Sequence, residues 1–288
     1  MRLPALLVVG LLATLLSACS GANLIDALTP RSGYRLVSDI PYGEGPRRTL
    51  DIYVPTRPLT GPVPVIVFFY GGRWDSGSKD VYRFVAQAFT SRGYAVVIPD
   101  YRLYPEVRFP EFIRDSAAAV AWTHAHAAEH VPNAGPLVLA GHSAGAHIAA
   151  LLHLHPTWLA ADVRDAIAAA VGMSGPYDFL PITDRTALEV FGPGPAGPDT
   201  QPITFVDGSA APMLLIHARN DTTVRPYNTE HLAARIREGG GIAEERYHDR
   251  LAHVGVVAAL AAPLRTLIPI LDEIDSFLRR HTAPSALR

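Results

Sequence analysis

The sequence of 288 residues has one cysteine, Cys19, close to the N-terminus. A single cysteine excludes an intramolecular disulfide framework and a zinc site built from cysteines. Basic residues are not in excess, because 25 Lys and Arg stand against 27 Asp and Glu, and there is no basic stripe of the kind that binds nucleic acid. No apolar run reaches the roughly 20 residues that a helix needs to cross a bilayer. Hydrophobic residues make up 49% and charged residues 18%, which predicts a folded chain with a buried core.

The N-terminal residues account for the cysteine. Arg2 precedes an apolar stretch at 3–16, and small residues follow it, which is the pattern of an export signal. Leu-Ser-Ala-Cys at 16–19 resembles the bacterial lipobox, in which the peptide is cut before the cysteine and the thiol is lipidated. We therefore expect a lipoprotein signal at 1–18, a tether at 19–33, and an exported protein anchored to a membrane through Cys19, on the periplasmic side or at the cell surface.

Short apolar runs alternate with longer helical patterns in the rest of the chain. The runs are apolar on both faces, as parallel strands covered by helices are. Strands are predicted at 63–70, 94–99, 137–141, 166–173 and 213–218, and helices at 81–92, 110–129, 145–155, 228–238 and 263–280. Residues 34–40 and 49–54 are expected to add a pair of antiparallel edge strands. The alternation predicts an α/β domain at 34–282, a doubly wound, mostly parallel sheet with helices on both faces.

A G-x-S-x-G pattern, Gly141-His142-Ser143-Ala144-Gly145, lies between a predicted strand and an Ala-rich helical stretch. The pattern is common by itself, but a sharp strand-to-helix turn leaves no room for side chains at its two glycines. Such a turn presents the serine hydroxyl at the end of the sheet, and the helix N-terminus adds positive potential near a developing oxyanion. Ser143 is therefore the predicted nucleophile.

A serine nucleophile needs a base, and the base needs an orienting acid. After this kind of turn the acid precedes the histidine along the chain. Asp221 follows the predicted strand at 213–218 and is the predicted acid, with Asp178 after the preceding strand as the alternative. His253 lies in a loop before the next helical stretch and is the predicted base, with His248, directly after the strand expected at 244–247, as the alternative.

A Gly-rich turn, Tyr70-Gly71-Gly72-Arg73-Trp74, ends another predicted strand. It resembles the His-Gly-Gly-x-Trp segment of α/β-hydrolase carboxylesterases, a group that includes kynurenine formamidase-like enzymes. The block at 100–115 resembles the one that these enzymes carry after strand four. The resemblance extends from about residue 35 to 280, with Ser143, Asp221 and His253 in order. It implies an α/β-hydrolase fold and a hydrolase of this class.

The Gly-rich turn also supplies candidates for the remaining roles around Ser143. An oxyanion hole needs backbone N–H groups that point at the carbonyl oxygen. The N–H groups of Gly72, Arg73 and Ala144 are the predicted donors. Trp74 and His142 are expected to bind substrate, although core packing remains open for Trp74.

Two residues depart from the family pattern. Tyr70 stands where the family usually has His, which puts the loop geometry in question. Arg73 stands where a lipase-like branch has a third Gly. We expect the Arg73 side chain to pair with Asp75 or Glu106 rather than with a substrate carboxylate.

These residues together predict a serine carboxylesterase for small to medium esters. The short Pro- and Gly-rich insertion at 176–212 favours accessible substrates and is expected to form a loop with short helices over one face of the sheet. The alternatives are an arylformamidase that uses the same residues and a non-catalytic binding lipoprotein on the same fold. No phosphate-cradling Gly loop is present, and His126 and His130 lack a third ligand, so we expect no cofactor and no metal.

Overall fold

The computed structural model describes residues 25, 28–57, 59–192 and 197–283. The predicted signal at 1–18 and Cys19 lie outside the described residues, so export and lipid attachment stay predictions. Within the described ranges, no helix is long and apolar enough to span a bilayer.

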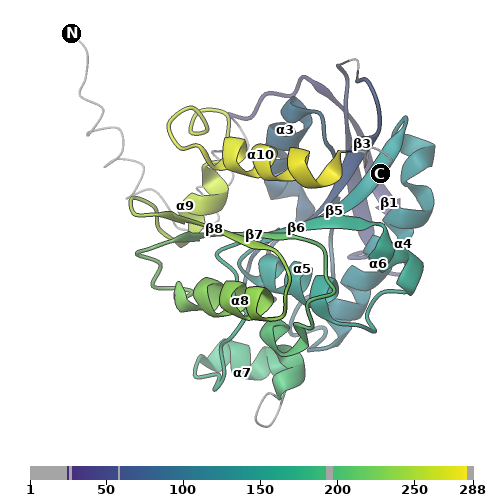
Figure 1. The fold of residues 1–288 in the computed structure, drawn as a ribbon. Helices are drawn as coiled ribbons and strands as arrows, with labels where there is room; N and C mark the ends of the chain where they lie inside the picture. The colour runs from purple at the N-terminus through teal and green to yellow at the C-terminus, as the bar shows by residue number, and fades with distance from the viewer. Residues whose placement is uncertain (1–24, 26–27, 58, 193–196, 284–288) are drawn as a thin grey trace.

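Eight strands form one sheet through the middle of the molecule (Figure 1). They are β1 (Tyr34–Pro41), β2 (Thr49–Pro55), β3 (Val63–Phe69), β4 (Ala95–Pro99), β5 (Ala134–His142), β6 (Ile167–Met173), β7 (Met213–Ala218) and β8 (Ala243–His248). The strand order is β1-β2-β4-β3-β5-β6-β7-β8. β2 pairs antiparallel with β1 and β4, and the other neighbouring strands are parallel. The predicted mostly parallel sheet is confirmed.

Helices cover both faces of this sheet (Figure 1). α3 (Arg83–Arg92) and α10 (Ile270–Thr282) lie on one face, and α4 (Glu111–His130), α5 (Ala144–Leu154) and α8 (Tyr227–Glu238) lie on the other. The shorter segments are α6 (Ala161–Asp165), α7 (Arg185–Phe191), α9 (His253–Ala258) and the 3₁₀ turns η1 (Lys79–Tyr82), η2 (Pro198–Thr200) and η3 (Pro202–Phe205). All five residues of β4 are buried, as a strand covered on both faces requires.

The last helix begins later than the sequence pattern predicts. The expected range was 263–280, but α10 begins at Ile270, directly after Pro269. The preceding residues form turns, in which the Leu267 N–H donates to the Leu264 carbonyl at 2.9 Å. Proline lacks an N–H and clashes with the preceding helical turn, so it is tolerated at the start of a helix and not inside one.

The register of the parallel strands brings their carboxyl ends to one edge of the sheet. Phe69 at the end of β3 lies opposite Gly141 of β5, and Ala218 at the end of β7 lies opposite His248 of β8. The segments that follow these strands therefore leave the sheet at the same edge. Ser143, Asp221 and His253 lie in the segments that follow β5, β7 and β8.

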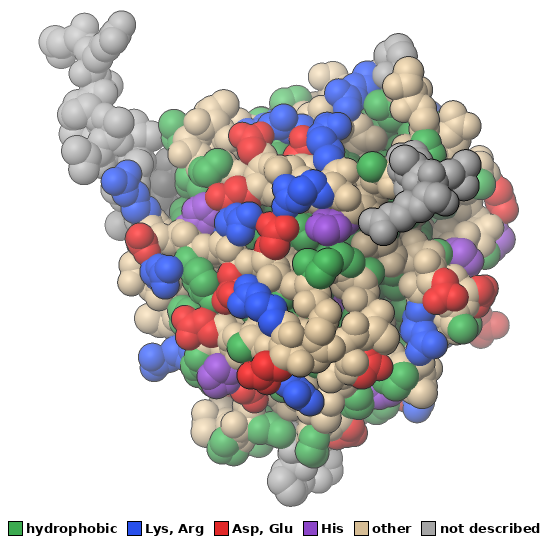
Figure 2. Space-filling model, in the orientation of Figure 1, with side chains coloured by type: hydrophobic (Ala, Val, Ile, Leu, Met, Phe, Trp, Pro, Cys, Tyr) green, Lys and Arg blue, Asp and Glu red, His purple; other side chains and the backbone are tan. Residues whose placement is uncertain are grey.

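The charged side chains on the face shown in Figure 2 are mixed in sign. Acidic and basic groups alternate over it without a broad area of either. This agrees with the near balance of the whole sequence, whose formal net charge is −2. The face drawn is therefore not a polyanion-binding surface.

Candidate active site

Ser143 lies in the sharp turn between β5 and α5 that the sequence predicts. Its backbone has φ 55° and ψ −122°, a region that non-glycine residues rarely occupy. A Cβ on Gly141 would lie 2.2 Å from the Gly145 carbonyl oxygen, and one on Gly145 would lie 2.0 Å from the Phe69 carbonyl oxygen. Only glycine fits at either position. The close packing of β3 against this turn holds the Ser143 hydroxyl at the end of the sheet.

Three side chains from segments that follow β5, β7 and β8 meet at this turn. His253, the first residue of α9, places Nε2 2.8 Å from Ser143 Oγ and Nδ1 2.7 Å from Asp221 Oδ2. The N–H groups of Thr223 and Val224 both donate to Asp221 Oδ1 at 2.9 Å, which fixes the carboxylate. Nδ1–H of His253 faces the carboxylate, and its free Nε2 faces the serine hydroxyl. This is the geometry in which an imidazole accepts a serine proton.

A second histidine contacts the same carboxylate. His217 Nε2 donates to the Val224 carbonyl at 2.9 Å and lies 3.4 Å from Asp221 Oδ2, while its Nδ1 lies 2.8 Å from Thr229 Oγ1. Burial alone raises the pKa of Asp221, but hydrogen bonds from His217 and His253 outweigh burial and hold this pKa below its ordinary value. Asp221 is therefore ionised at neutral pH. His217 is fully buried, and no motif in the sequence indicated its contact with the acid.

The alternative acid and base lie elsewhere. Asp178 Oδ2 pairs with His231 Nδ1 at 2.6 Å on α8. His248, the last residue of β8, places Nε2 3.1 Å from Glu273 Oε2. Neither Asp178 nor His248 contacts Ser143. The residues that meet at the serine are Asp221 and His253.

The Gly-rich turn after β3 lies beside Ser143. A Cβ on Gly72, which has φ 134°, would lie 2.2 Å from the Ser76 carbonyl oxygen, so the turn requires glycine there. Arg73 and Ala144 line the cavity next to Ser143, and their N–H groups form no hydrogen bond within the described part of the chain. Gly72 does not line the cavity. Of the three predicted oxyanion donors, two are therefore placed to serve an oxyanion.

Tyr70 supports this turn through a buried network. Its hydroxyl donates to Asp100 Oδ1 at 2.7 Å and accepts from Arg47 Nη2 at 2.8 Å. Arg47 Nη2 also donates to the Gly77 carbonyl at 2.8 Å, at the far end of the turn. Burial is the main cause that raises the pKa of Tyr70 well above 10, so the phenol stays neutral. The departure from histidine is thus accommodated by a tyrosine that ties both ends of the turn together. The sequence carried no signal for Arg47.

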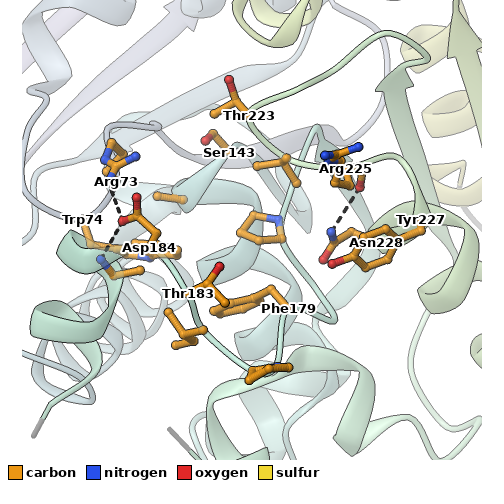
Figure 3. A pocket seen from close by; sticks show the side chains of 16 residues that line it. Arg73, Trp74, Ser143, Phe179, Thr183, Asp184, Thr223, Arg225, Tyr227 and Asn228 are labelled. Atoms are coloured by element: carbon orange, nitrogen blue, oxygen red, sulfur yellow. Dashed lines mark hydrogen bonds and ion pairs between the residues drawn. The ribbon is translucent and has the colours of Figure 1, made fainter. Parts of the chain in front are cut away.

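A cavity of about 240 Å³ opens beside Ser143 (Figure 3). Trp74 is buried to 6% exposure and its ring forms one wall, with Phe179 and Tyr227 on other sides. Trp74 therefore lines the cavity, as predicted, while it also packs in the core. The segment at 176–187 forms much of the rim, and Asp184 and Arg225 were not identified from the sequence.

Two sequence predictions need correction. His142 does not line the cavity, because its ring is buried beside His253 and its Nε2–H donates to the His253 carbonyl at 3.1 Å. Burial, followed by the proximity of His253, lowers the pKa of His142 to about 3, so it is neutral. Arg73 pairs with neither Asp75 nor Glu106 but with Asp184, at 2.6 Å, because the rim segment folds back over the turn.

In the described ranges, no group of three or more His, Cys, Asp or Glu side chains is arranged to hold a metal ion. The chemistry that the site itself provides is a hydroxyl, an imidazole and a carboxylate in line, with unpaired N–H groups beside them.

The strand order and the serine turn define an α/β-hydrolase. The chain belongs to the BD-FAE family, whose model matches residues 50–236. Among solved structures, a truncated carbohydrate esterase from gut microbiota superposes with a TM-score of 0.75 at 19% identity, over 89% of this chain and 99% of that one. The apo form of Thermogutta terrifontis esterase 2 superposes with a TM-score of 0.71 at 24% identity, over 88% of this chain and 98% of that one. These two structures share the fold.

Curated relatives are similar over part of their length. A kynurenine formamidase from Danio rerio is 35% identical over 155 residues, which are 53% of this chain and 50% of the fish protein. Esterase LipC from Mycobacterium tuberculosis is 28% identical over 222 residues, 68% of this chain and 54% of LipC. The chain thus spans about half the length of these relatives.

Proposed function

We propose that this protein is a serine carboxylesterase that hydrolyses small to medium carboxylic esters. The observation that carries the proposal is the line of Ser143, His253 and Asp221, with distances of 2.8 and 2.7 Å, at the edge of a 240 Å³ cavity. Relatives named esterase support ester hydrolysis as the class of reaction. The cavity volume supports a substrate of modest size.

In the first step, Ser143 Oγ bonds to the ester carbonyl carbon and its proton moves to His253 Nε2. The carbonyl oxygen becomes an oxyanion, which accepts hydrogen bonds from the N–H groups of Arg73 and Ala144. Asp221 keeps Nδ1–H of His253 oriented and stabilises the imidazolium. The tetrahedral intermediate then collapses, the C–O bond to the alcohol breaks, and His253 gives its proton to the leaving oxygen.

In the second step, water replaces the alcohol. His253 Nε2 takes a proton from the water as its oxygen bonds to the acyl carbon. The new tetrahedral intermediate breaks its bond to Ser143 Oγ, which recovers a proton from His253. The products are a carboxylic acid, an alcohol and the original enzyme.

An arylformamidase is the second candidate. It is supported by the 35% identity to a kynurenine formamidase and by the aromatic walls that Trp74 and Phe179 give the cavity. The same residues would attack a formyl carbon and expel an aryl amine in place of an alcohol. Turnover of an N-formyl aryl amine, compared with that of a short aryl ester, separates the two activities.

The test is a panel of short-chain aryl esters with wild type, Ser143→Ala and Ser209→Ala. Ser209 is an exposed serine outside the cavity whose hydroxyl donates to Asp207, so it is the matched control. We expect Ser143→Ala to lower kcat by at least about 10⁴-fold and Ser209→Ala to leave it unchanged. Equal activity of Ser143→Ala and wild type would overturn the mechanism. Failure of a fluorophosphonate probe to label Ser143 would instead favour a non-catalytic binding protein.

A further inference from the structure

Two arginines line the cavity, and their charges are balanced differently. Arg73 is held by Asp184 at 2.6 Å, and hydrogen bonding to Arg73 is the first cause that lowers the pKa of Asp184. Asp184 also accepts from the Ala187 N–H at 2.9 Å, as the cap of α7. The Arg73–Asp184 pair therefore adds no net charge to the cavity.

The positive charge of Arg225 has no negatively charged partner among the described residues that line the cavity. Asp184 is the one carboxylate among the described residues that line the cavity, and its charge is used by Arg73. Within the described part of the chain, no ion pair or hydrogen bond involves the Arg225 guanidinium. Figure 3 shows Arg73 and Arg225 on opposite sides of the cavity, with Ser143 between them in that view. Among the described side chains that line the cavity, Arg225 is thus the one charged group without a partner of opposite charge.

The backbone of Arg225 is fixed relative to the acid of the site. Asp221 Oδ1 accepts from the N–H groups of Thr223 and Val224, and the Arg225 carbonyl accepts from the backbone N–H of Asn228 at 3.1 Å. The side-chain amide of Asn228 also donates to this carbonyl at 3.1 Å. Only the side chain of Arg225 is left free to adjust. A group bound by it therefore lies at a limited range of distances from Ser143.

We propose that the natural substrate is an ester that carries a carboxylate and that Arg225 binds this carboxylate. A guanidinium matches a carboxylate in a bidentate pair, and one guanidinium balances one negative charge. A doubly charged phosphate monoester would need a second cation, and Arg73, the other cation that lines the cavity, is already paired with Asp184. This inference rests on the proposed esterase activity and names the substrate class.

The test uses two matched pairs of esters. 4-Nitrophenyl hydrogen glutarate and 4-nitrophenyl butyrate differ by a carboxylate on the acyl side. 4-Carboxyphenyl butyrate and phenyl butyrate differ by a carboxylate on the leaving group. Each pair is assayed with wild type, Arg225→Gln, Arg225→Lys and Arg235→Gln. Arg235 is an exposed arginine of α8 that does not line the cavity, so its loss controls for a change in overall charge.

We expect Arg225→Gln to raise KM for the anionic member of at least one pair roughly tenfold, with kcat and the neutral esters unchanged. Arg225→Lys keeps part of the preference because it keeps the charge, and Arg235→Gln behaves as wild type. An equal effect of Arg225→Gln on anionic and neutral esters, no effect on either, or the same loss in Arg235→Gln would overturn this inference alone. Absence of any Ser143-dependent turnover of all four esters would overturn the proposed function, and this inference with it.

Discussion

Replacing Asp221 by Asn tests the acid of the site without changing its shape. The carboxylate faces donors on both sides: the N–H groups of Thr223 and Val224 at Oδ1, and His253 Nδ1 at Oδ2. An asparagine has one acceptor oxygen and one NH₂ group, so it cannot satisfy both sides. The free energies of its two orientations therefore decide the outcome.

If the asparagine oxygen turns to His253, its NH₂ group meets the N–H groups of Thr223 and Val224, which both lose their acceptor. Because Thr223 is exposed and Val224 half-buried, each lost hydrogen bond costs about 0.5–1.5 kcal/mol, and this orientation costs about 1–3 kcal/mol. The other orientation keeps both backbone hydrogen bonds and presents NH₂ to His253. His253 then accepts at Nδ1 and carries its proton on Nε2, where it can no longer accept the proton of Ser143. We expect this orientation and a fall in kcat of about 10⁴-fold, the size found when a triad acid becomes an amide.

The assay is the initial rate on a neutral aryl ester, with thermal melting to show that the variant is folded. Asp178→Asn is the matched control, because the Asp178 carboxylate pairs with His231 on α8 and does not line the cavity. We expect it to keep its rate within about twofold, since a partly exposed pair contributes little. A fully active Asp221→Asn, or an inactive Asp178→Asn that is folded, would refute the reasoning.

Two further predictions concern stability. Gly145→Ala places a Cβ 2.0 Å from the Phe69 carbonyl oxygen, so β3 or α5 must shift. We expect the free energy of unfolding in urea to fall by about 3 kcal/mol or more. An unchanged urea midpoint would contradict the packing described. Burial lowers the pKa of His147 and His153 from 6.5 to about 4. The unfolded chain therefore binds more protons between about pH 6.5 and 4, and stability falls as the pH falls through this range. His153→Gln, which can still donate to the Ala211 carbonyl, is expected to reduce the fall in melting temperature between pH 6.5 and 4. An unchanged dependence of melting temperature on pH would show that His153 does not contribute to it.

Features with a local cause were predictable from the sequence. The strands are continuous apolar runs, and β7 has the predicted bounds, 213–218. The turn at Ser143 was recognisable because two glycines flank one serine between a strand and a helix, and the structure shows a backbone contact that excludes a side chain at each. Asp221 and His253 were predicted by chain order after strands, and parallel strands do bring such positions together at one edge.

Features that depend on contacts between distant segments were not predictable. Arg73 and Asp184 are 111 residues apart, and only the fold of the rim segment joins them. His142 was expected to bind substrate, yet the turn directs its ring toward the backbone of His253. Arg225 has no motif around it. What distinguishes it is that no carboxylate of the described residues pairs with its guanidinium, which can be seen only in the three-dimensional structure.

The loop after β7 has a consequence for how the specificity of this protein can evolve. Two N–H groups of this loop donate to the Asp221 carboxylate, and the Asn228 side chain donates to the Arg225 carbonyl. An insertion or deletion between 221 and 228 would therefore displace the acid. A change of side chain at position 225 breaks none of these hydrogen bonds. New substrate charges can therefore be accommodated by single substitutions in this loop. A change in substrate length is accommodated more readily at 180–187 of the rim, because the N–H groups of Tyr177 and Asp178 are bound to Asn228.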